Sequence, residues 1–152
     1  SNAFAGADYL IEFTKMDKKD LRIIFLGNPE FARYHLEKII SLSVYSEKNN
    51  ILLSNKFELD VLMRFAISSQ ISSAITSAGI KPKQNFILIA LGNKKILDKL
   101  YKEIEDISIE IFSKDNTSFL KKYFKITNKQ LDAIISKNPL EDILIEKAAI
   151  LL

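Results

Sequence analysis

Cysteine is absent from this sequence of 152 residues. The absence excludes disulfide bonds and thiolate metal sites, and it fits an intracellular location, which we expect to be the cytoplasm. Long hydrophobic runs are missing too. The longest, at residues 86–91, is far too short to cross a bilayer, so we expect no membrane partner. Only four glycines and three prolines are present, which argues against long disordered linkers.

The chain also has few of the residues that build catalytic sites. His35 is its only histidine, so a histidine-rich metal site is excluded, and a Ser-His-Asp triad would need a histidine from inside a predicted helix. The glycines are isolated from one another, which excludes Walker and Rossmann phosphate loops. Neighbouring acids, such as Glu103 with Glu105 and Glu141 with Asp142, are typical of solvated helix faces. We therefore expect no catalytic residue, no metal site and no cofactor.

The charge balance is mildly basic. The chain has 22 basic and 19 acidic residues, for a formal net charge of +3. Three groups of lysines are Lys81 with Lys83, Lys94 with Lys95, and Lys121, Lys122, Lys125 and Lys129. Each group is explained more simply as solvated surface than as a set of phosphate contacts, so the composition permits nucleic-acid binding without requiring it.

Apolar spacing and capping residues predict both strands and helices. We expect strands at residues 9–15, 21–26, 86–91 and 107–112, a helix at 28–44 that begins with Asn28-Pro29-Glu30, and a short extended or buried piece at 51–53. Further helices are expected at 57–65, from Ser68 to Gly79, after Asn93, after a Thr127–Gln130 capping box, and from Asn138-Pro139 onwards. The pattern predicts an α+β or mixed α/β fold, in which a sheet of about four strands packs with several helices. We expect residues 4–152 to form a single domain, and we interpret residues 1–3 as a scar of tag removal.

Helical spacing also predicts which side chains face the core. The inward set comprises Leu59, Leu62, Met63 and Ala66, then Ile71, Ala74 and Ile75, and later Leu131, Ile134 and Ile135. Continuing the first stripe without a break would bury the polar Gln70, so we expect the helix to break at residues 68–70. The next helix then begins at Gln70, where free N–H groups can hold an anion. The alternative is that Gln70 simply caps its own helix.

A series of short motifs runs through residues 57–92. They are Asp60-Val61-Leu62, Ser68-Ser69-Gln70-Ile71-Ser72-Ser73-Ala74-Ile75, Gly79-Ile80-Lys81 and the apolar run Phe86-Ile87-Leu88-Ile89-Ala90-Leu91. Outer segments are Asn28-Pro29-Glu30, Lys122-Tyr123-Phe124-Lys125-Ile126-Thr127 and Glu146-Lys147-Ala148-Ala149-Ile150-Leu151. In this order and spacing, the motifs resemble the TPRKB-like family, the small kinase-binding subunit of the KEOPS (also EKC) complex.

Two positions depart from the family pattern. Archaeal members often carry an arginine just before the Gln-Ile pair, where this chain has Ser69. Many members have basic residues ahead of the acidic-apolar helix, where this chain has Leu53 and Asn55, with only Lys56 basic. Both departures concern nucleic-acid contacts more than the fold.

The resemblance implies a non-catalytic subunit of a tRNA-modifying complex. In KEOPS, a Gcp-type ATPase subunit transfers a threonylcarbamoyl group to an adenosine beside the tRNA anticodon. A small atypical kinase binds that subunit, and the TPRKB-like subunit binds the kinase and the single-stranded CCA end of tRNA. Carried onto this chain, the tRNA-binding candidates are Asn55, Lys56, Arg64, Ser69, Gln70, Lys81 and Lys83. We expect the cations among them to share one groove if the helix at 57–65 and the next helix pack as an antiparallel pair.

The kinase-binding face is expected near the C-terminus. Residues 143–152 are richly apolar, and in the resembled family this segment contributes to the kinase contact. The candidates are Ile143, Leu144, Lys147, Ala148 and Ile150. The alternative is that the segment closes the core.

Two other functions remain open: a small enzyme with a pocket between sheet and helices that uses Gln70 and a carboxylate, and an unrelated protein-interaction domain. An enzyme should show a closed pocket with strongly perturbed acids, and an adaptor an exposed apolar patch with a basic groove.

Overall fold

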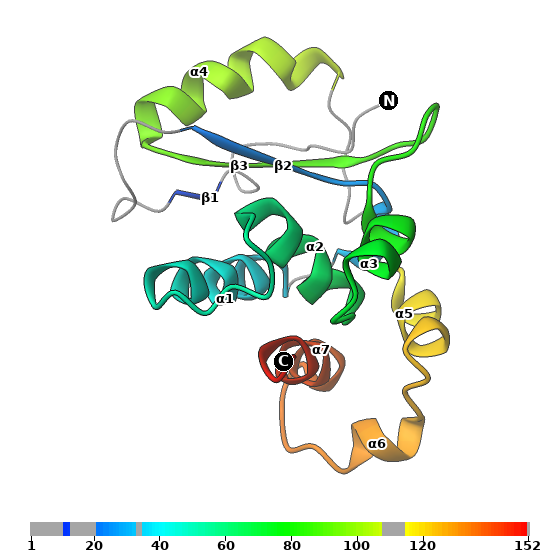
Figure 1. Cartoon of the computed structure of the whole chain (residues 1–152). Helices are drawn as coiled ribbons and strands as arrows, with labels where there is room; N and C mark the ends of the chain where they lie inside the picture. Colours follow the sequence, from blue (N-terminus) through cyan, green and yellow to red (C-terminus); the bar gives the residue numbers. More distant parts are fainter. Residues whose placement is uncertain (1–10, 13–20, 33–34, 108–114, 152) are drawn as a thin grey trace. The chain divides into compact units, whose positions relative to one another are not determined.

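The computed structural model describes residues 11–12, 21–32, 35–107 and 115–151 (Figure 1). The chain divides into two compact units, each made of two stretches that are far apart in sequence. The first unit comprises residues 1–29 and 79–113, and the second comprises residues 30–78 and 114–152. The expectation that they form a single domain stays a prediction.

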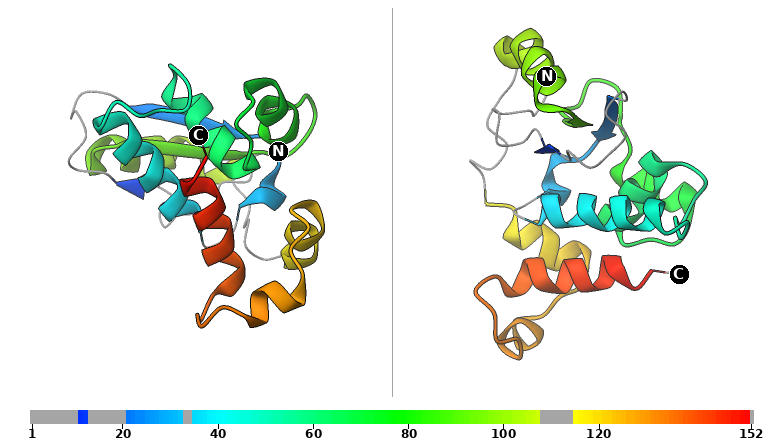
Figure 2. Two further views of the ribbon diagram at one scale, coloured as in Figure 1. Left: turned by 60° about the horizontal axis from the view of Figure 1, so that its bottom comes forward. Right: turned by 90° about the vertical axis from the view of Figure 1, so that its left-hand side faces the viewer.

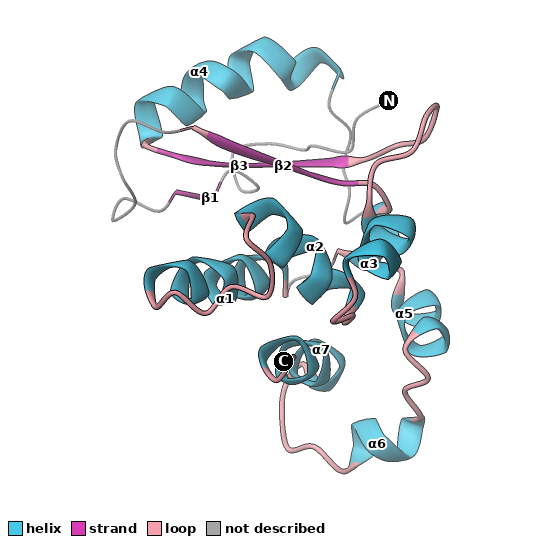
Figure 3. Ribbon diagram, viewed as in Figure 1, coloured by secondary structure: helices cyan, strands magenta, loops and turns pink. Residues whose placement is uncertain are grey.

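The first unit is built on a small sheet (Figure 3). Its strands are β1 (Ile11–Glu12), β2 (Arg22–Leu26) and β3 (Ile87–Gly92), in the order β1-β3-β2. β2 runs antiparallel to β3, with Arg22 opposite Leu91 and Leu26 opposite Ile87, whereas β1 adds only a two-residue parallel pairing. Every residue of β3 is buried, which confirms the predicted central strand with two covered faces.

Helix α4 (Lys94–Ile104) covers one face of this sheet. As predicted, Asn93 caps it: its side-chain oxygen accepts a hydrogen bond of 2.9 Å from the backbone N–H of Ile96. Leu97 then packs on Leu88 and Ala90 of β3, and the partly buried side chains around this cluster are Ile23, Phe86, Leu100, Tyr101 and Ile104. The short 3₁₀ helix η3 (Glu105–Ile107) follows.

The predicted sheet of about four strands is wrong. In the described residues the sheet has three strands, of which only β2 and β3 pair over more than two residues. The strand expected at 9–15 is reduced to Ile11–Glu12, with residues 9–10 and 13–15 outside the described residues. Of the strand expected at 107–112, Ile107 ends a 3₁₀ helix, and residues 108–112 also lie outside the described residues.

The second unit is helical (Figure 2). Its α-helices are α1 (Leu36–Lys48), α2 (Phe57–Ala66), α3 (Ile71–Ala78), α5 (Thr117–Tyr123), α6 (Asn128–Asp132) and α7 (Pro139–Ala149). α1, α2 and α7 pack against one another, α3 packs on α2, and α6 contacts α7. The break between α2 and α3, the Thr127–Gln130 capping box and the Asn138-Pro139 helix start are confirmed.

The predicted helix at 28–44 is wrong over nearly its first half. Asn28-Pro29-Glu30 leads into a single 3₁₀ turn, η2 (Pro29–Phe31), and α1 begins only at Leu36, with His35 as its N-cap residue. Tyr34, which was expected on that helix, lies outside the described residues. Residues 51–53 form a loop rather than an extended element, because the chain must turn from the end of α1 to the start of α2.

Some predicted core positions are also wrong. On α3, Ala74 and Ala78 are fully buried while Ile71 and Ile75 are exposed, because only small side chains let α3 approach α2 closely. Ile135 is fully exposed, because α6 ends at Asp132 and the stripe that would have placed Ile135 inward is not helical.

Candidate functional site

A hollow of about 670 Å³ lies in the second unit where the end of α7 meets the loop between α1 and α2. We call it the C-terminal hollow. It is lined by Leu42, Tyr45, Ser46, Ile51, Leu52, Leu53, Met63, Arg64, Ser69, Ala149 and Leu151. Most of these side chains are apolar, no carboxylate is among them, and Arg64 is their only cation.

The base of the hollow is held by a buried ion pair on α2. Nε of Arg64 donates to Oδ1 of Asp60 at 2.8 Å, and one terminal nitrogen donates to Oδ2 at 3.2 Å, so the pair is bidentate. Both side chains are buried. Their spacing of four residues puts them on the same face of one helix.

This pair also joins three other segments. Arg64 donates to the carbonyl oxygen of Ala148 at 2.7 Å and to the hydroxyl of Ser46 at 2.9 Å. Asp60 accepts a hydrogen bond of 2.9 Å from the backbone N–H of Leu53. The carbonyl of Ala148 lies in the last turn of α7, where carbonyls lack helical partners and a cation is favourable. The pair therefore fixes α1, α7 and the loop at 51–53 around α2.

Two tight helix ends shape the chain around the hollow. The turn after α1 contains Asn50 at φ 55°, and the turn after α2 contains Ile67 at φ 49°. In each case the next residue donates its N–H back across the turn, Ile51 to Ser46 and Ser68 to Met63. Asparagine tolerates this left-handed conformation, but a β-branched isoleucine rarely adopts it. These turns direct residues 51–53 and Ser69 to the hollow.

The rim of the hollow exposes large apolar side chains. Tyr45 is 62% exposed and Ile51 is 56% exposed. Ile150, which lies between the lining residues Ala149 and Leu151, is 68% exposed. A surface that combines exposed aromatic and aliphatic groups with a concave base is typical of a protein-binding site.

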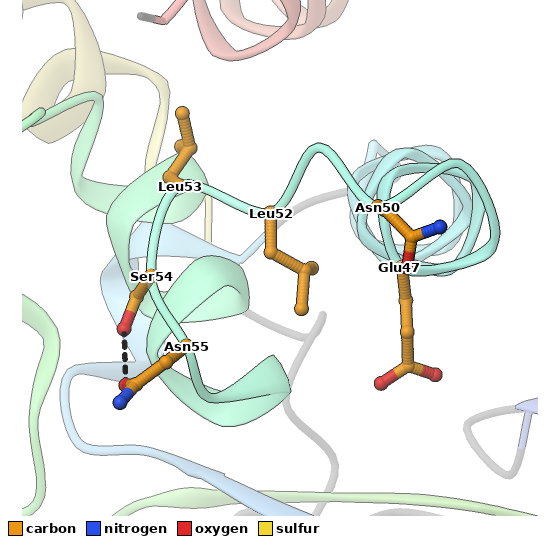
Figure 4. Close-up of a pocket in the computed structure, with 6 residues that line it drawn as sticks. All are labelled: Glu47, Asn50, Leu52, Leu53, Ser54 and Asn55. Atoms are coloured by element: carbon orange, nitrogen blue, oxygen red, sulfur yellow. Dashed lines mark hydrogen bonds between the residues drawn. The ribbon is translucent and has the colours of Figure 1, made fainter.

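A second, more polar hollow of about 470 Å³ adjoins the first (Figure 4). It shares Leu52 and Leu53 with the C-terminal hollow and adds Glu47, Asn50, Ser54 and Asn55. Figure 4 shows Leu52 and Leu53 on opposite sides of their loop, with Leu52 on the same side as Glu47. Ser54 donates a long hydrogen bond of 3.4 Å to Asn55.

The structure removes Arg64 from the tRNA-binding candidates. Its side chain is buried and its donors are engaged by Asp60, Ser46 and Ala148, so it cannot serve as a phosphate contact on the surface. This correction has a simple cause: the sequence shows the charge of Arg64, but not the three segments that fold over it.

The remaining candidates are all exposed, but those of the second unit do not form one cluster. Lys56 precedes the first residue of α2, while Ser69 and Gln70 follow its other end. Ten helical residues span about 15 Å, so the length of α2 separates them. Ser69 lines the C-terminal hollow and Asn55 the second hollow. Lys81 and Lys83 belong to the first unit, where both are exposed.

The kinase-binding candidates separate into two groups. Ile143, Leu144 and Ala148 are buried, because α7 packs against α1 and α2, and the prediction that these three are exposed anchors is wrong. Lys147 is partly exposed, and Ile150 remains at the surface. For the first three residues, the alternative that the segment closes the core therefore holds.

Potential catalytic groups are scattered. His35 is buried with its ring 5.9 Å from that of Phe65. Asp142 accepts a hydrogen bond from Ser136, whereas Glu103 and Glu105 are exposed on the first unit. Within the described residues, no group of three or more histidine or acidic side chains is arranged to hold a metal ion. In the same residues, no helix has the length and apolar character needed to cross a membrane.

Sequence reasoning missed the Asp60–Arg64 pair and the exposed rim. The available signal for the pair was an acid and a base four residues apart in the mostly apolar helix Phe57–Ala66. Tyr45 and Ile51 gave no comparable signal, because exposure depends on how the helices pack. Comparison with protein-family models and with curated proteins gives no match for this chain.

Proposed function

We propose that this chain is a non-catalytic subunit of a KEOPS-type complex and that it binds the small atypical kinase of that complex through the C-terminal hollow. The observation that carries the proposal is the apolar hollow with the exposed lining residues Tyr45 and Ile51. The resemblance to the TPRKB-like family supplies the identity of the partner. Through the kinase, the subunit is linked indirectly to the Gcp-type ATPase, and we place the complex in the cytoplasm.

The hollow has the physical character of a docking site. A partner helix or loop that inserts an apolar anchor would remove Tyr45 and Ile51 from water, and a few such residues dominate the affinity of an interface. Below them, the Asp60–Arg64 pair fixes the surrounding segments. Because the floor of the hollow is fixed before the partner binds, less conformational entropy is lost on association.

The lining also favours binding over catalysis. Among the described residues that line the C-terminal hollow there is no carboxylate, and the one cation, Arg64, is neutralised by Asp60. An enzyme needs an acid, base or nucleophile at the place where substrate binds. The second hollow contains Glu47, but Gln70, the other residue assigned to the enzyme hypothesis, is not part of either lining. We therefore propose that the chain has no active site of its own.

Binding of the tRNA 3′ CCA end is the second part of the proposal. Two groups of exposed side chains remain candidates for it after Arg64 is removed: Asn55, Lys56 and Gln70 on the second unit, and Lys81 and Lys83 on the first. Ser69 takes the place of a family arginine next to Gln70. We expect this binding to be weak and sensitive to salt, because few cations contribute.

Co-expression with the kinase tests the proposal. The rim variants Tyr45→Asp and Ile51→Asp should lose the kinase during purification, because each places a charge in an apolar contact. Ile135→Asp is the matched control, since it alters an equally apolar, fully exposed side chain that lies outside the hollow. Retention of the kinase by both rim variants would refute the proposed interface.

A further inference from the structure

The positive charge of this chain is concentrated in one segment. Five of its 22 basic residues and two of its 19 acidic residues lie between positions 115 and 138, so the rest of the chain carries equal numbers of the two kinds. The segment contains α5 and α6 of the second unit (Figures 1 and 2). We call the surface formed by Lys121, Lys122, Tyr123, Lys125 and Lys129 the α5–α6 surface.

The lysines of this surface are available to a ligand. Lys122, Lys125 and Lys129 are exposed, and in the described residues no ion pair engages them. Lys121 is partly buried and donates a hydrogen bond to Asn128 at the start of α6, which ties the two helices together. Lys122 lies in the last turn of α5, Lys125 in the turn that follows and Lys129 in α6, so three positive charges come from one short stretch of chain.

An exposed aromatic residue, Tyr123, follows Lys122 directly in the sequence. Tyr123 is 44% exposed, although its ring stacks on Phe119 at 5.7 Å and meets Phe31 and Phe124 edge-on at 4.9 Å. Its hydroxyl donates to Ser77 at 2.8 Å. The ring is therefore held in place before any ligand arrives, which lowers the cost of stacking a base on it.

Lys125 lies in a backbone conformation that glycine adopts more readily. After α5, Ile126 donates to the carbonyl of Lys121 at 2.8 Å and Lys125 donates to that of Lys122 at 3.3 Å, which is the Schellman pattern of a helix end. Lys125 has φ 55° in this turn, a left-handed conformation that glycine adopts without strain. Its side chain is exposed, so its charge is accessible to a ligand.

We propose that the α5–α6 surface binds single-stranded RNA, with backbone phosphates at Lys122, Lys125 and Lys129 and one base stacked on Tyr123. An acidic protein would be attracted by the same lysines. The exposed and fixed ring of Tyr123 favours RNA over such a protein, because RNA has bases that can stack on the ring. The surface shares no residue with the kinase-binding hollow or with the candidates for the tRNA 3′ end. The inference therefore does not rest on the proposed function.

The test measures binding of a fluorescent oligouridine of about 12 nucleotides to the full chain by anisotropy at several salt concentrations. Changing Lys122, Lys125 and Lys129 together to alanine should weaken binding and lower the slope of log affinity against log salt by about two. Tyr123→Ala should weaken binding by about 5- to 100-fold, whereas Tyr123→Phe keeps the ring and should bind nearly as well as the unchanged chain. Lys99→Ala, an exposed lysine of α4, is the matched control.

Lys125→Gly separates function from folding. It should raise the melting temperature by relieving the left-handed strain and at the same time weaken RNA binding, which a purely structural lysine would not do. If the triple lysine variant binds the RNA as the unchanged chain does, the proposal is overturned. It is also overturned if polyglutamate displaces the RNA as efficiently as unlabelled oligouridine does. Because the lysine variants alter exposed side chains only, the test stands even if Tyr123→Ala fails to fold.

Discussion

The guanidinium of Arg64 lies 2.8 Å from the carboxylate of Asp60, one turn earlier on the same helix, and both side chains are buried. Around this pair are the hydroxyl of Ser46, the backbone N–H of Leu53 and the carbonyl of Ala148. One ionic contact therefore connects α2 to the end of α1, the following loop and the end of α7.

Removing one member of this pair should destabilise the second unit strongly. Arg64→Ala leaves the Asp60 carboxylate buried without its cation, and we expect a loss of about 3–5 kcal/mol in the free energy of unfolding. Arg64→Lys keeps the charge but not the forked geometry, so it should recover only part of that loss. Urea unfolding followed by circular dichroism measures both. A loss below about 1 kcal/mol for Arg64→Ala would mean that the pair is not structurally important.

Charge on the inner face of α7 should unfold the unit rather than only disrupt an interface. Ile143 is buried against α1 and α2, so Ile143→Asp should abolish cooperative unfolding or lower stability by about 3 kcal/mol or more. Ile150→Asp is the control, because this side chain is 68% exposed. It should leave the melting temperature almost unchanged. A stable, folded Ile143→Asp protein that merely fails to bind the kinase would restore the surface role first expected for this residue.

Gly27 is required by close packing within the first unit. A Cβ atom there would lie 1.8 Å from the carbonyl oxygen of Gly79. Because the clashing atoms belong to the backbone, the backbone itself would have to move to remove the clash. Gly27→Ala should therefore lower stability by about 3 kcal/mol or more. Gly92→Ala is a matched control, since the nearest atom to its Cβ would be 3.5 Å away on the Leu21 side chain. Equal melting temperatures for the two variants would contradict the close approach.

Ser69→Arg tests the proposed contact with the tRNA 3′ end. The added cation lies beside Gln70 at the start of α3, where it should strengthen binding of intact tRNA and steepen its salt dependence by about one phosphate contact. Binding of tRNA without its CCA end should not change. Filter binding of the two RNAs at several salt concentrations makes the comparison. An equal gain for both RNAs would indicate only nonspecific attraction.

The sequence-based predictions that the structure confirms depend on local patterns. Asn93 caps α4, Thr127 and Gln130 form a capping box, and the run at 86–91 becomes the buried strand β3, because each depends on neighbours within a few residues. The predictions that failed depend on distant segments. Arg64 is covered by Ser46 and Ala148, which lie 18 and 84 residues away in the sequence. No local sequence pattern predicts these contacts.

The same limit applies to the candidate site. The apolar C-terminal segment was recognised as a possible interface, but apolar character alone does not separate the buried Ile143 from the exposed Ile150. Ile71 and Ile75 show the converse, since the helix buries its alanines and leaves the larger side chains outside. The distance to which two helices can approach decides which face of a helix is buried. That distance depends on the side chains of both helices, so the sequence of one helix does not predict it.

The central claim is that the C-terminal hollow binds the kinase, and calorimetric titration of the purified kinase into the full chain tests it most directly. The unchanged chain should bind with one-to-one stoichiometry. Ile51→Asp should weaken binding by about tenfold or more with no change in melting temperature, and the control Ile135→Asp should match the unchanged chain. Unaltered affinity in a folded Ile51→Asp protein, or the absence of any binding by the unchanged chain, would contradict the claim.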